Sequence, residues 1–161
     1  MDNKISIKTL NEYPQYAPIF AYWSHIQWYS ERKIDFSVNV NSYIQRSQNE
    51  SIPITLIALY DSIPAGMVSL KMNNLWNRPD LSPWMGSLFV YPKFRGLGIS
   101  KQLVNSAVLK AKSFNFSKLY LFIGNNPEFD LLSFYSKLGW YFFDDCIDND
   151  GKESKIMCFD L

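Results

Sequence analysis

The chain has few of the histidine and cysteine side chains that metal sites and disulfide frameworks need. It contains one histidine, His25, and two cysteines, Cys146 and Cys158, which have neither CxxC spacing nor neighbouring histidines. Transition metals in proteins are held mainly by clustered histidine and cysteine side chains, and a disulfide scaffold needs several cysteines at close spacing. We therefore expect no metal site and two reduced cysteines.

The chain also lacks an excess of charge and a long apolar run. Its 16 Lys and Arg nearly balance 15 Asp and Glu, for a net charge of +1, so it has no general attraction for nucleic acid or anionic membranes. No apolar run approaches the roughly 18 residues that span a bilayer, and the start, residues 1–4, is not followed by a signal-peptide core. We expect a cytoplasmic protein without nucleic-acid or membrane partners.

Apolar and aromatic side chains are plentiful, at 47% and 17% of the residues. That is ample material for one core, and 161 residues suit one domain. No repeat, low-complexity segment or flexible linker interrupts the chain. The sequence therefore predicts a single domain over residues 1–161.

The apolar periodicity predicts an order of seven strands and four helices. A strand, a helix and a strand follow one another over 84–123, which indicates two parallel strands joined by a crossover helix. Turns at Asp61-Ser62 and Asp148-Asn149-Asp150-Gly151 predict antiparallel hairpins. Strands are expected over 4–10, 53–60, 63–72, 84–91, 118–123, 140–147 and 154–161, and helices over 14–30, 37–49 (opened by Ser37), 97–114 and 128–138, with Ile99, Leu103, Val104, Ala107 and Ala111 facing inward.

One turn in this order has the properties of a pyrophosphate site. The strand ending at Val90 runs through Arg95-Gly96-Leu97-Gly98-Ile99-Ser100 into an amphipathic helix. Glycine lets the backbone approach a ligand closely, and the free N–H groups of a first helical turn attract anionic oxygens. Lys101 stands where a dinucleotide fingerprint has its third glycine, and no Gly-Lys-Ser/Thr of a Walker turn follows. A different phosphorylated cofactor is therefore indicated.

Two blocks together resemble the GNAT superfamily of acetyl-CoA-dependent N-acetyltransferases, and the resemblance covers most of the chain. Residues 95–100 are similar to the family's Arg/Gln-x-x-Gly-x-Gly/Ala turn. Residues 133–140, Ser-Phe-Tyr-Ser-Lys-Leu-Gly-Trp, are similar to its Phe-Tyr-x-x-Leu-Gly-Phe/Trp signature. The sequence departs from the pattern at Ser100, which stands where Gly or Ala is usual but keeps its backbone N–H.

The resemblance implies an α/β fold with a mixed, mostly antiparallel central sheet of about seven strands, about four helices, and a parallel strand–helix–strand unit over 84–123. It implies acetyl-CoA as cosubstrate, with its pantetheine arm bonded along the fourth strand like an added strand. Phe89 or Tyr91 would pack against the pantetheine arm, and the Lys93 and Arg95 side chains could neutralise phosphate charge. The implied cofactor-binding residues are Leu88, Phe89, Val90, Arg95, Gly96, Leu97, Gly98, Ile99, Ser100, Lys101, Asn125 and Asn126.

The implied reaction is direct transfer of an acetyl group to a primary amine in a ternary complex, without an enzyme nucleophile. By resemblance, Tyr135 is the general acid for the leaving thiolate, although a packing tyrosine fits the position too. Asn125 and Asn126 equally suit turn formation. The fourth strand carries no glutamate, so we assign no general base. Candidates by chemistry alone are His25, Glu31, Asp80 and Glu128.

The acceptor stays open between a small-molecule and a peptide amine. The region over residues 16–29 is rich in aromatic rings, which could bind a cationic amine or pack in the core. The loop over residues 77–84 could cover the acceptor. Two alternative functions are a non-catalytic acyl-CoA-binding sensor and a protein-interaction module. The last hairpin is a candidate homodimer surface through Phe142, Phe143, Met157 and Phe159.

Overall fold

The computed structural model describes residues 4–161 and contains a seven-stranded sheet of order β1-β2-β3-β4-β5-β7-β6. Strands β4 and β5 are parallel, with Trp84 opposite Tyr120, whereas the pairs β1–β2, β5–β7 and β6–β7 are antiparallel. The predicted mixed sheet is thereby confirmed. Its strands are β1 (Ile5–Thr9), β2 (Ile54–Tyr60), β3 (Ile63–Lys71), β4 (Trp84–Val90), β5 (Lys118–Gly124), β6 (Tyr141–Ile147) and β7 (Glu153–Asp160).

Four α-helices lie in the described residues, with shorter 3-10 and π segments beside them. They are α1 (Ala17–Ser24), α2 (Phe36–Arg46), α3 (Ile99–Ser113) and α4 (Leu131–Lys137). The 3-10 segments are η1 (Leu10–Glu12), η2 (Pro14–Tyr16) and η4 (Pro92–Phe94), and the π segment is η3 (His25–Tyr29). The five residues expected to face inward from α3 are all buried.

Several helix boundaries differ from the prediction because particular side chains cap the helices. Helix α2 starts after Asp35, not at Ser37, since the Asp35 carboxylate accepts a hydrogen bond from the Ser37 N–H at 2.8 Å. Helix α4 starts later than predicted, after Asp130, whose carboxylate accepts from the Ser133 N–H at 3.0 Å. Each carboxylate satisfies an N–H that the first helical turn leaves without a backbone partner.

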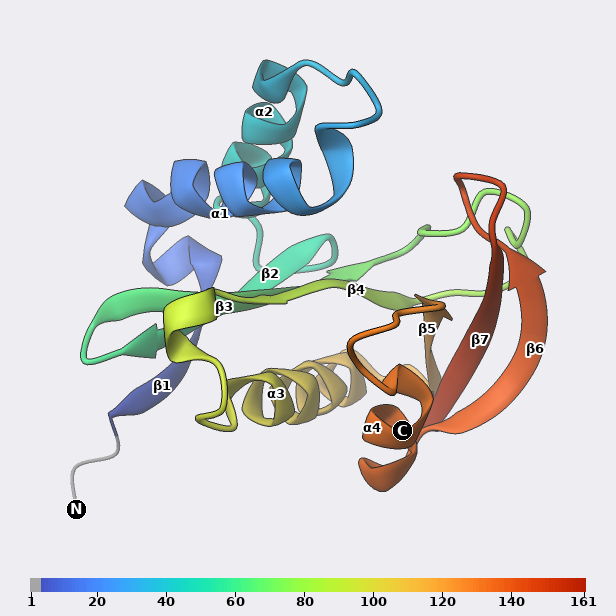
Figure 1. The fold of residues 1–161 in the computed structure, drawn as a ribbon. Coiled ribbons are helices and arrows are strands. Elements are labelled where there is room, and N and C mark those ends of the chain that lie inside the picture. The colour runs from blue at the N-terminus through green and yellow to red at the C-terminus, as the bar shows by residue number, and fades with distance from the viewer. Residues whose placement is uncertain (1–3) are drawn as a thin grey trace. The chain divides into compact units, whose positions relative to one another are not determined.

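The described chain divides into two compact units. Unit 1 contains residues 4–69 and 87–106, and unit 2 contains residues 70–86 and 107–161. In unit 1, α1 and α2 lie over one face of β2 and β3, and the start of α3 lies on the other face (Figure 1). Its core is built around Leu10, Phe20, Trp23, Tyr43 and Met67.

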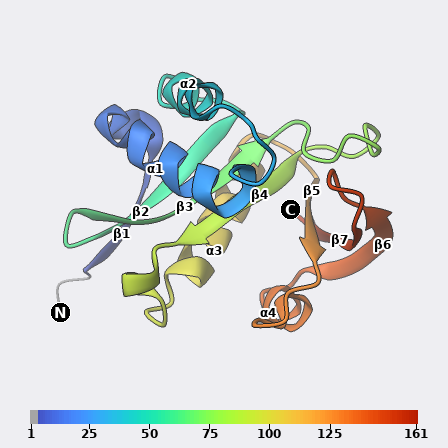
Figure 2. The same ribbon diagram turned by 45° about the horizontal axis from the view of Figure 1, so that its top comes forward.

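Unit 2 contains β5, β7 and β6 with helix α4, which follows β5 and leads into β6 (Figure 2). Its core includes Trp84, Tyr120, Ile156 and Cys158. The proline-bearing loop before β4 is held against the β6–β7 turn, because the Asn149 carboxamide accepts from the Trp76 N–H at 3.1 Å and donates to the Asn74 carbonyl at 2.9 Å. No helix within residues 4–161 is both long and apolar enough to cross a membrane.

Candidate active site

The end of β4 contains the segment that the sequence predicts to bind the pantetheine arm. Strand β3 pairs with one edge, where the Tyr91 N–H donates to the Ala65 carbonyl at 2.9 Å. Ser87 has a left-handed backbone with a φ of 55° inside the strand, which is typical of a bulge that interrupts a ladder. The predicted pantetheine strand, Leu88 to Val90, follows Ser87 and is half-buried.

Gly66 brings β3 and β4 unusually close at this point. A Cβ atom on Gly66 would lie 2.8 Å from the Phe89 carbonyl oxygen and 3.1 Å from the Leu103 side chain. A glycine within a strand often marks such a close backbone approach, and Gly66 is the signal by which the sequence could have indicated this contact. Gly66 therefore fixes the position of the predicted pantetheine strand against α3.

The glycine turn leaves open space above its backbone. Gly96 and Gly98 have φ angles of 81° and 76°, and a Cβ atom added to either residue would meet nothing within 4 Å. Gln102 donates the first helical hydrogen bond to the Gly98 carbonyl at 3.2 Å. The buried Ile99 anchors the turn, while Lys101 is exposed and Ser100 half-buried. The first-turn N–H groups are thus directed toward a site that a phosphate can enter.

Arg95 links the strand to the turn. Its Nε donates to the Val90 carbonyl at 3.0 Å, and its guanidinium carbon lies 5.9 Å from the Phe89 ring centre. A guanidinium has five N–H donors, so four remain for an anionic oxygen. The Lys93 ammonium lies 5.7 Å from the Phe94 ring centre. Both basic residues are exposed.

Rings from α1 and η3 cover the aromatic side chains of this strand. Trp23 stacks on Tyr91 at 5.2 Å and lies 5.5 Å from Phe89, and Trp28 lies 6.4 Å from Phe89. Phe20 and Trp23 belong to the core, so the packing interpretation holds for them. The other rings within residues 16–29 are partly or largely exposed, namely Tyr16, Tyr22, Trp28 and Tyr29.

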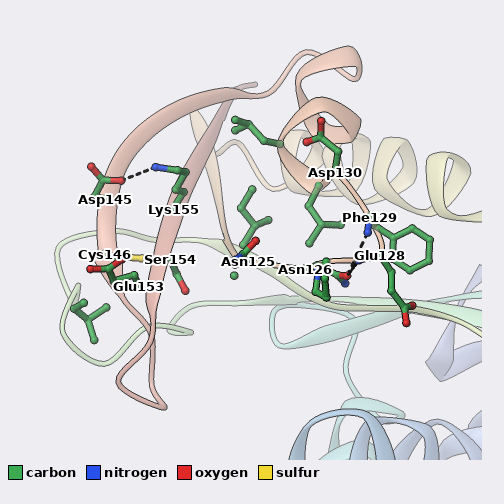
Figure 3. Close-up of a pocket in the computed structure, with 16 residues that line it drawn as sticks. Asn125, Asn126, Glu128, Phe129, Asp130, Asp145, Cys146, Glu153, Ser154 and Lys155 are labelled. Carbon is green, nitrogen blue, oxygen red and sulfur yellow. Dashed lines mark hydrogen bonds and ion pairs between the residues drawn. The ribbon is translucent and has the colours of Figure 1, made fainter.

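In unit 2, both predicted asparagines line a cavity of about 1010 Å³ (Figure 3). The Asn126 carboxamide oxygen accepts from the N–H groups of Glu128 at 2.8 Å and Phe129 at 3.3 Å. Asn126 is therefore a turn former, one of the two roles that the sequence left open. Asn125 has an exposed side chain at the end of β5.

The same cavity is rich in carboxylates. Glu128, Asp130, Asp145 and Glu153 line it, together with one cation, Lys155, which pairs with Asp145 at 2.9 Å. The pocket therefore carries a net negative charge, which favours cationic over anionic groups.

Tyr135 is almost fully buried within unit 2, with 6% of its surface exposed. Its ring lies 5.0 Å from that of Phe134 and 5.9 Å from that of Trp140. Burial raises the pKa of Tyr135 well above its usual value, because the phenolate would lose its hydration. The hydroxyl therefore keeps its proton at neutral pH, as a general acid must, although the raised pKa makes it a weaker acid.

The four candidates for a general base differ in their surroundings. The His25 Nδ1 is buried without a hydrogen-bond partner, and its ring lies 5.3 Å from that of Phe36. Asp80 pairs with Arg78 at 3.0 Å, which lowers the pKa of this carboxyl. Glu31 is exposed and Glu128 lines the cavity of unit 2. Among residues 4–161, no three His, Cys, Asp or Glu side chains are grouped as metal ligands.

Comparison with known folds gives many structural matches. A Bacillus anthracis protein assigned as a streptothricin acetyltransferase, solved with acetyl coenzyme A, is 26% identical, with a TM-score of 0.58 over 75% of this chain and 67% of that chain. YncA from Salmonella typhimurium, assigned as an acetyltransferase and solved with acetyl-CoA, is 12% identical with a TM-score of 0.74 over 99% and 95%. Arabidopsis thaliana Naa50, bound to the bisubstrate analogue CoA-Ac-MVNAL, is 17% identical with a TM-score of 0.67 over 98% and 99%.

Structural similarity at less than 25% sequence identity establishes the fold alone. No curated protein matches the chain. The family assignment comes from the sequence match. The model of the Acetyltransferase (GNAT) family matches residues 15–140, which include both the glycine turn and the Tyr135 block. This chain therefore belongs to the GNAT family of acetyltransferases.

Proposed function

We propose that the protein transfers the acetyl group of acetyl-CoA to a primary amine, and that residues 1–161 act as one catalytic domain. The observation that carries the proposal is the open glycine turn of unit 1, where Gly96 and Gly98 hold left-handed conformations at the start of α3. Two proteins of this fold were solved with acetyl-CoA. The two free cysteines suit a reducing compartment, and we assign the protein to the cytoplasm.

The turn would bind the pyrophosphate through the N–H groups of residues 96–101, with Arg95 adding charge-assisted hydrogen bonds. The backbone of Leu88 to Val90 would bond the pantetheine arm as an added strand. Backbone N–H groups near these residues would also stabilise the oxyanion. For Asn125 and Asn126 the support is the family pattern, and the free side chain of Asn125 makes it the stronger candidate of the two.

The chemistry needs no enzyme nucleophile. The acceptor ammonium first loses a proton to solvent, and the neutral nitrogen then bonds to the thioester carbonyl carbon to give the tetrahedral oxyanion. As the carbonyl re-forms, the C–S bond breaks and the nitrogen loses its extra proton to solvent. Tyr135 would donate a hydrogen bond and then its proton to the leaving sulfur, and solvent would replace that proton. Thiols have a pKa near 8.5, below the ordinary tyrosine value near 10, and burial raises the pKa of Tyr135 further. Tyr135 would therefore act mainly by stabilising the developing thiolate as the bond breaks.

A second function is a sensor that binds acyl-CoA without transferring the acyl group. It is supported by the sequence of β4, Trp-Met-Gly-Ser-Leu-Phe-Val, which contains no carboxylate to serve as a base. A sensor would bind acetyl-CoA as tightly as an enzyme and release no free coenzyme A in the presence of amines.

The deciding experiment is a thiol-release assay with acetyl-CoA and a panel of amines that includes polyamines, aminoglycosides and peptides with free N-termini. The proposed enzyme releases coenzyme A and forms acetylated product, detectable by mass spectrometry, with at least one amine. Binding of acetyl-CoA without release across the panel would favour the sensor. Absence of binding would contradict both functions.

A further inference from the structure

Helix α1 continues into η3, and the turn there holds one residue more than an α-helical turn. The Ser30 N–H donates to the carbonyl of His25, five positions earlier, at 2.9 Å, whereas an α-helix bonds residues four positions apart. Single π turns of this kind are rare, and they occur frequently at functional sites. The extra residue changes which side chain follows Trp23 on the same face of the helix.

The π turn brings Trp28, and not Gln27, to Phe89. The Trp23 ring lies 5.5 Å from the Phe89 ring. In an α-helix the side chains one turn beyond Trp23 would be those three and four positions on, Ile26 and Gln27, and both are exposed here. The π turn gives this place to the residue five positions on, and the Trp28 ring lies 6.4 Å from that of Phe89, edge to face. An indole therefore flanks the predicted pantetheine strand.

Trp28 is more accessible to a ligand than Trp23. Trp23 belongs to the core of unit 1 and is 7% exposed. Trp28 and Phe89 pack against that core but are only half-buried. Phe89 lies within Leu88 to Val90, the segment that would bond the pantetheine arm. Accessible aromatic surface therefore lies beside the strand that would hold the thioester.

These rings come from segments without carboxylates. Residues 13–30 and 87–106 contain no Asp or Glu, and their charged residues are Lys93, Arg95 and Lys101. The Arg95 guanidinium carbon lies 5.9 Å from the Phe89 ring centre. Aromatic rings pack against apolar groups and attract a single ammonium group, but a second ammonium group would find only positive charges in these segments. The carboxylate-rich cavity of unit 2 has the opposite chemistry.

We propose that Trp28 is a specificity-determining residue, which selects acceptors with one ammonium group close to an aromatic or branched apolar group. The proposal rests on the acetyl transfer proposed above. The attacking nitrogen must lie about 3–3.5 Å from the thioester carbonyl carbon, so the rest of the acceptor lies against side chains that flank this strand. Trp28 and Phe89 would pack on its apolar group, and a polyamine would be disfavoured.

A purely structural role for Trp28 has different consequences. Loss of a ring that only packs would destabilise unit 1 and lower the rates with all amines by the same factor. Loss of a ring that contacts the acceptor raises KM for apolar amines alone, because uniform binding energy is lost, and it leaves kcat nearly unchanged. The relative rates with two amines therefore distinguish the roles.

The test measures kcat/KM for phenethylamine and for spermidine at saturating acetyl-CoA. We expect the native chain to prefer phenethylamine by about 10-fold or more, and Trp28→Ala to lose this preference through a higher KM for phenethylamine. Its kcat and its acetyl-CoA affinity should stay within about 3-fold of native. Trp28→Phe keeps a ring and should keep most of the preference.

Two further variants serve as controls. Tyr29→Ala removes a neighbouring half-buried ring of the same turn, one that lies 5.4 Å from the Arg32 guanidinium carbon, and it should leave the preference unchanged. Gln27→Trp/Trp28→Gln keeps the composition but moves the indole one position around the helix, so it should lose the preference as Trp28→Ala does. It provides the comparison independently if Trp28→Ala does not fold by circular dichroism.

The outcomes separate this proposal from the proposed function. A native preference for spermidine, which the acidic cavity of unit 2 would explain, would overturn the role of Trp28 and leave acetyl transfer intact. An unchanged preference in a folded Trp28→Ala chain or in the transposed variant would do the same. Absence of turnover with every amine, although acetyl-CoA binds, would overturn both.

Discussion

At the scale of single residues, Gly98 is the strictest requirement of the account. Gly98→Val should weaken acetyl-CoA binding by on the order of 100-fold or more, which corresponds to about 2.8 kcal/mol of binding free energy. The valine Cβ and its methyl groups would enter the space that the phosphate needs. Gly151 offers a matched control. It has a φ of 79° and equally open surroundings in the β6–β7 turn, so Gly151→Val carries similar backbone strain. Calorimetry should find normal binding in that variant. Equal affinity in both variants would remove the phosphate site from the turn.

Tyr135 gives a prediction about pH. Burial raises its pKa above the ordinary value near 10, so the hydroxyl is protonated throughout the range from about 6 to 9. Tyr135→Phe should therefore lower turnover by a constant factor, on the order of 100, at every pH in that range, with little change in acetyl-CoA affinity. Steady-state rates at several pH values test this. A factor that shrinks toward pH 9, or unchanged turnover, would contradict the assigned role.

At the scale of elements, the close approach of β3 and β4 predicts a specific sensitivity. Gly66→Ala would place a Cβ atom 2.8 Å from the Phe89 carbonyl oxygen. The strands would have to move apart, at a cost of about 1–3 kcal/mol in unfolding free energy, and acetyl-CoA affinity should fall because Phe89 belongs to the predicted pantetheine strand. Urea denaturation and calorimetry measure both effects. Gly124→Ala is the control, since its Cβ would meet only the Ser154 hydroxyl, at 3.8 Å. Equal unfolding free energies for Gly66→Ala and Gly124→Ala would contradict the close approach of β3 and β4.

The loop before β4 gives a second element-scale prediction. Asn149→Ala removes the hydrogen bonds to Trp76 and Asn74, which should lower the unfolding free energy by about 1–2 kcal/mol and expose the loop to limited proteolysis. Asn149→Asp keeps the acceptor oxygen for the Trp76 N–H and loses the donor, so an intermediate loss is expected. Equal cleavage rates in all three chains would show that these bonds do not hold the loop.

Periodicity predicted the order of strands and helices well, and it failed at their ends. The predicted helix over 14–30 consists of η2, α1 and η3, because spacing alone does not distinguish an α turn from the π turn that starts at His25. The starts of α2 and α4 depend on the Asp35 and Asp130 carboxylates. Such caps depend on where a polar side chain points, and the spacing of apolar residues does not indicate this.

At the scale of the whole molecule, the predictable part of the site was the part that is contiguous in sequence. Residues 95–101 form one turn, so their pattern alone indicated an anion site. The left-handed backbone at Ser87 left no signal, because serine rarely adopts a positive φ. The rings that cover Phe89 and Tyr91 come from residues 23 and 28, more than sixty positions earlier, and sequence spacing does not reveal such contacts.

The proposed function requires acetyl-CoA to bind at the glycine turn, and calorimetric titration of the purified native protein measures this binding. We expect micromolar binding of acetyl-CoA and of free coenzyme A, with a rise in melting temperature on addition of either, and no binding by Gly98→Val. Absence of heat and of thermal stabilisation in the native protein would contradict the account, leaving an acetyltransferase fold without its cosubstrate.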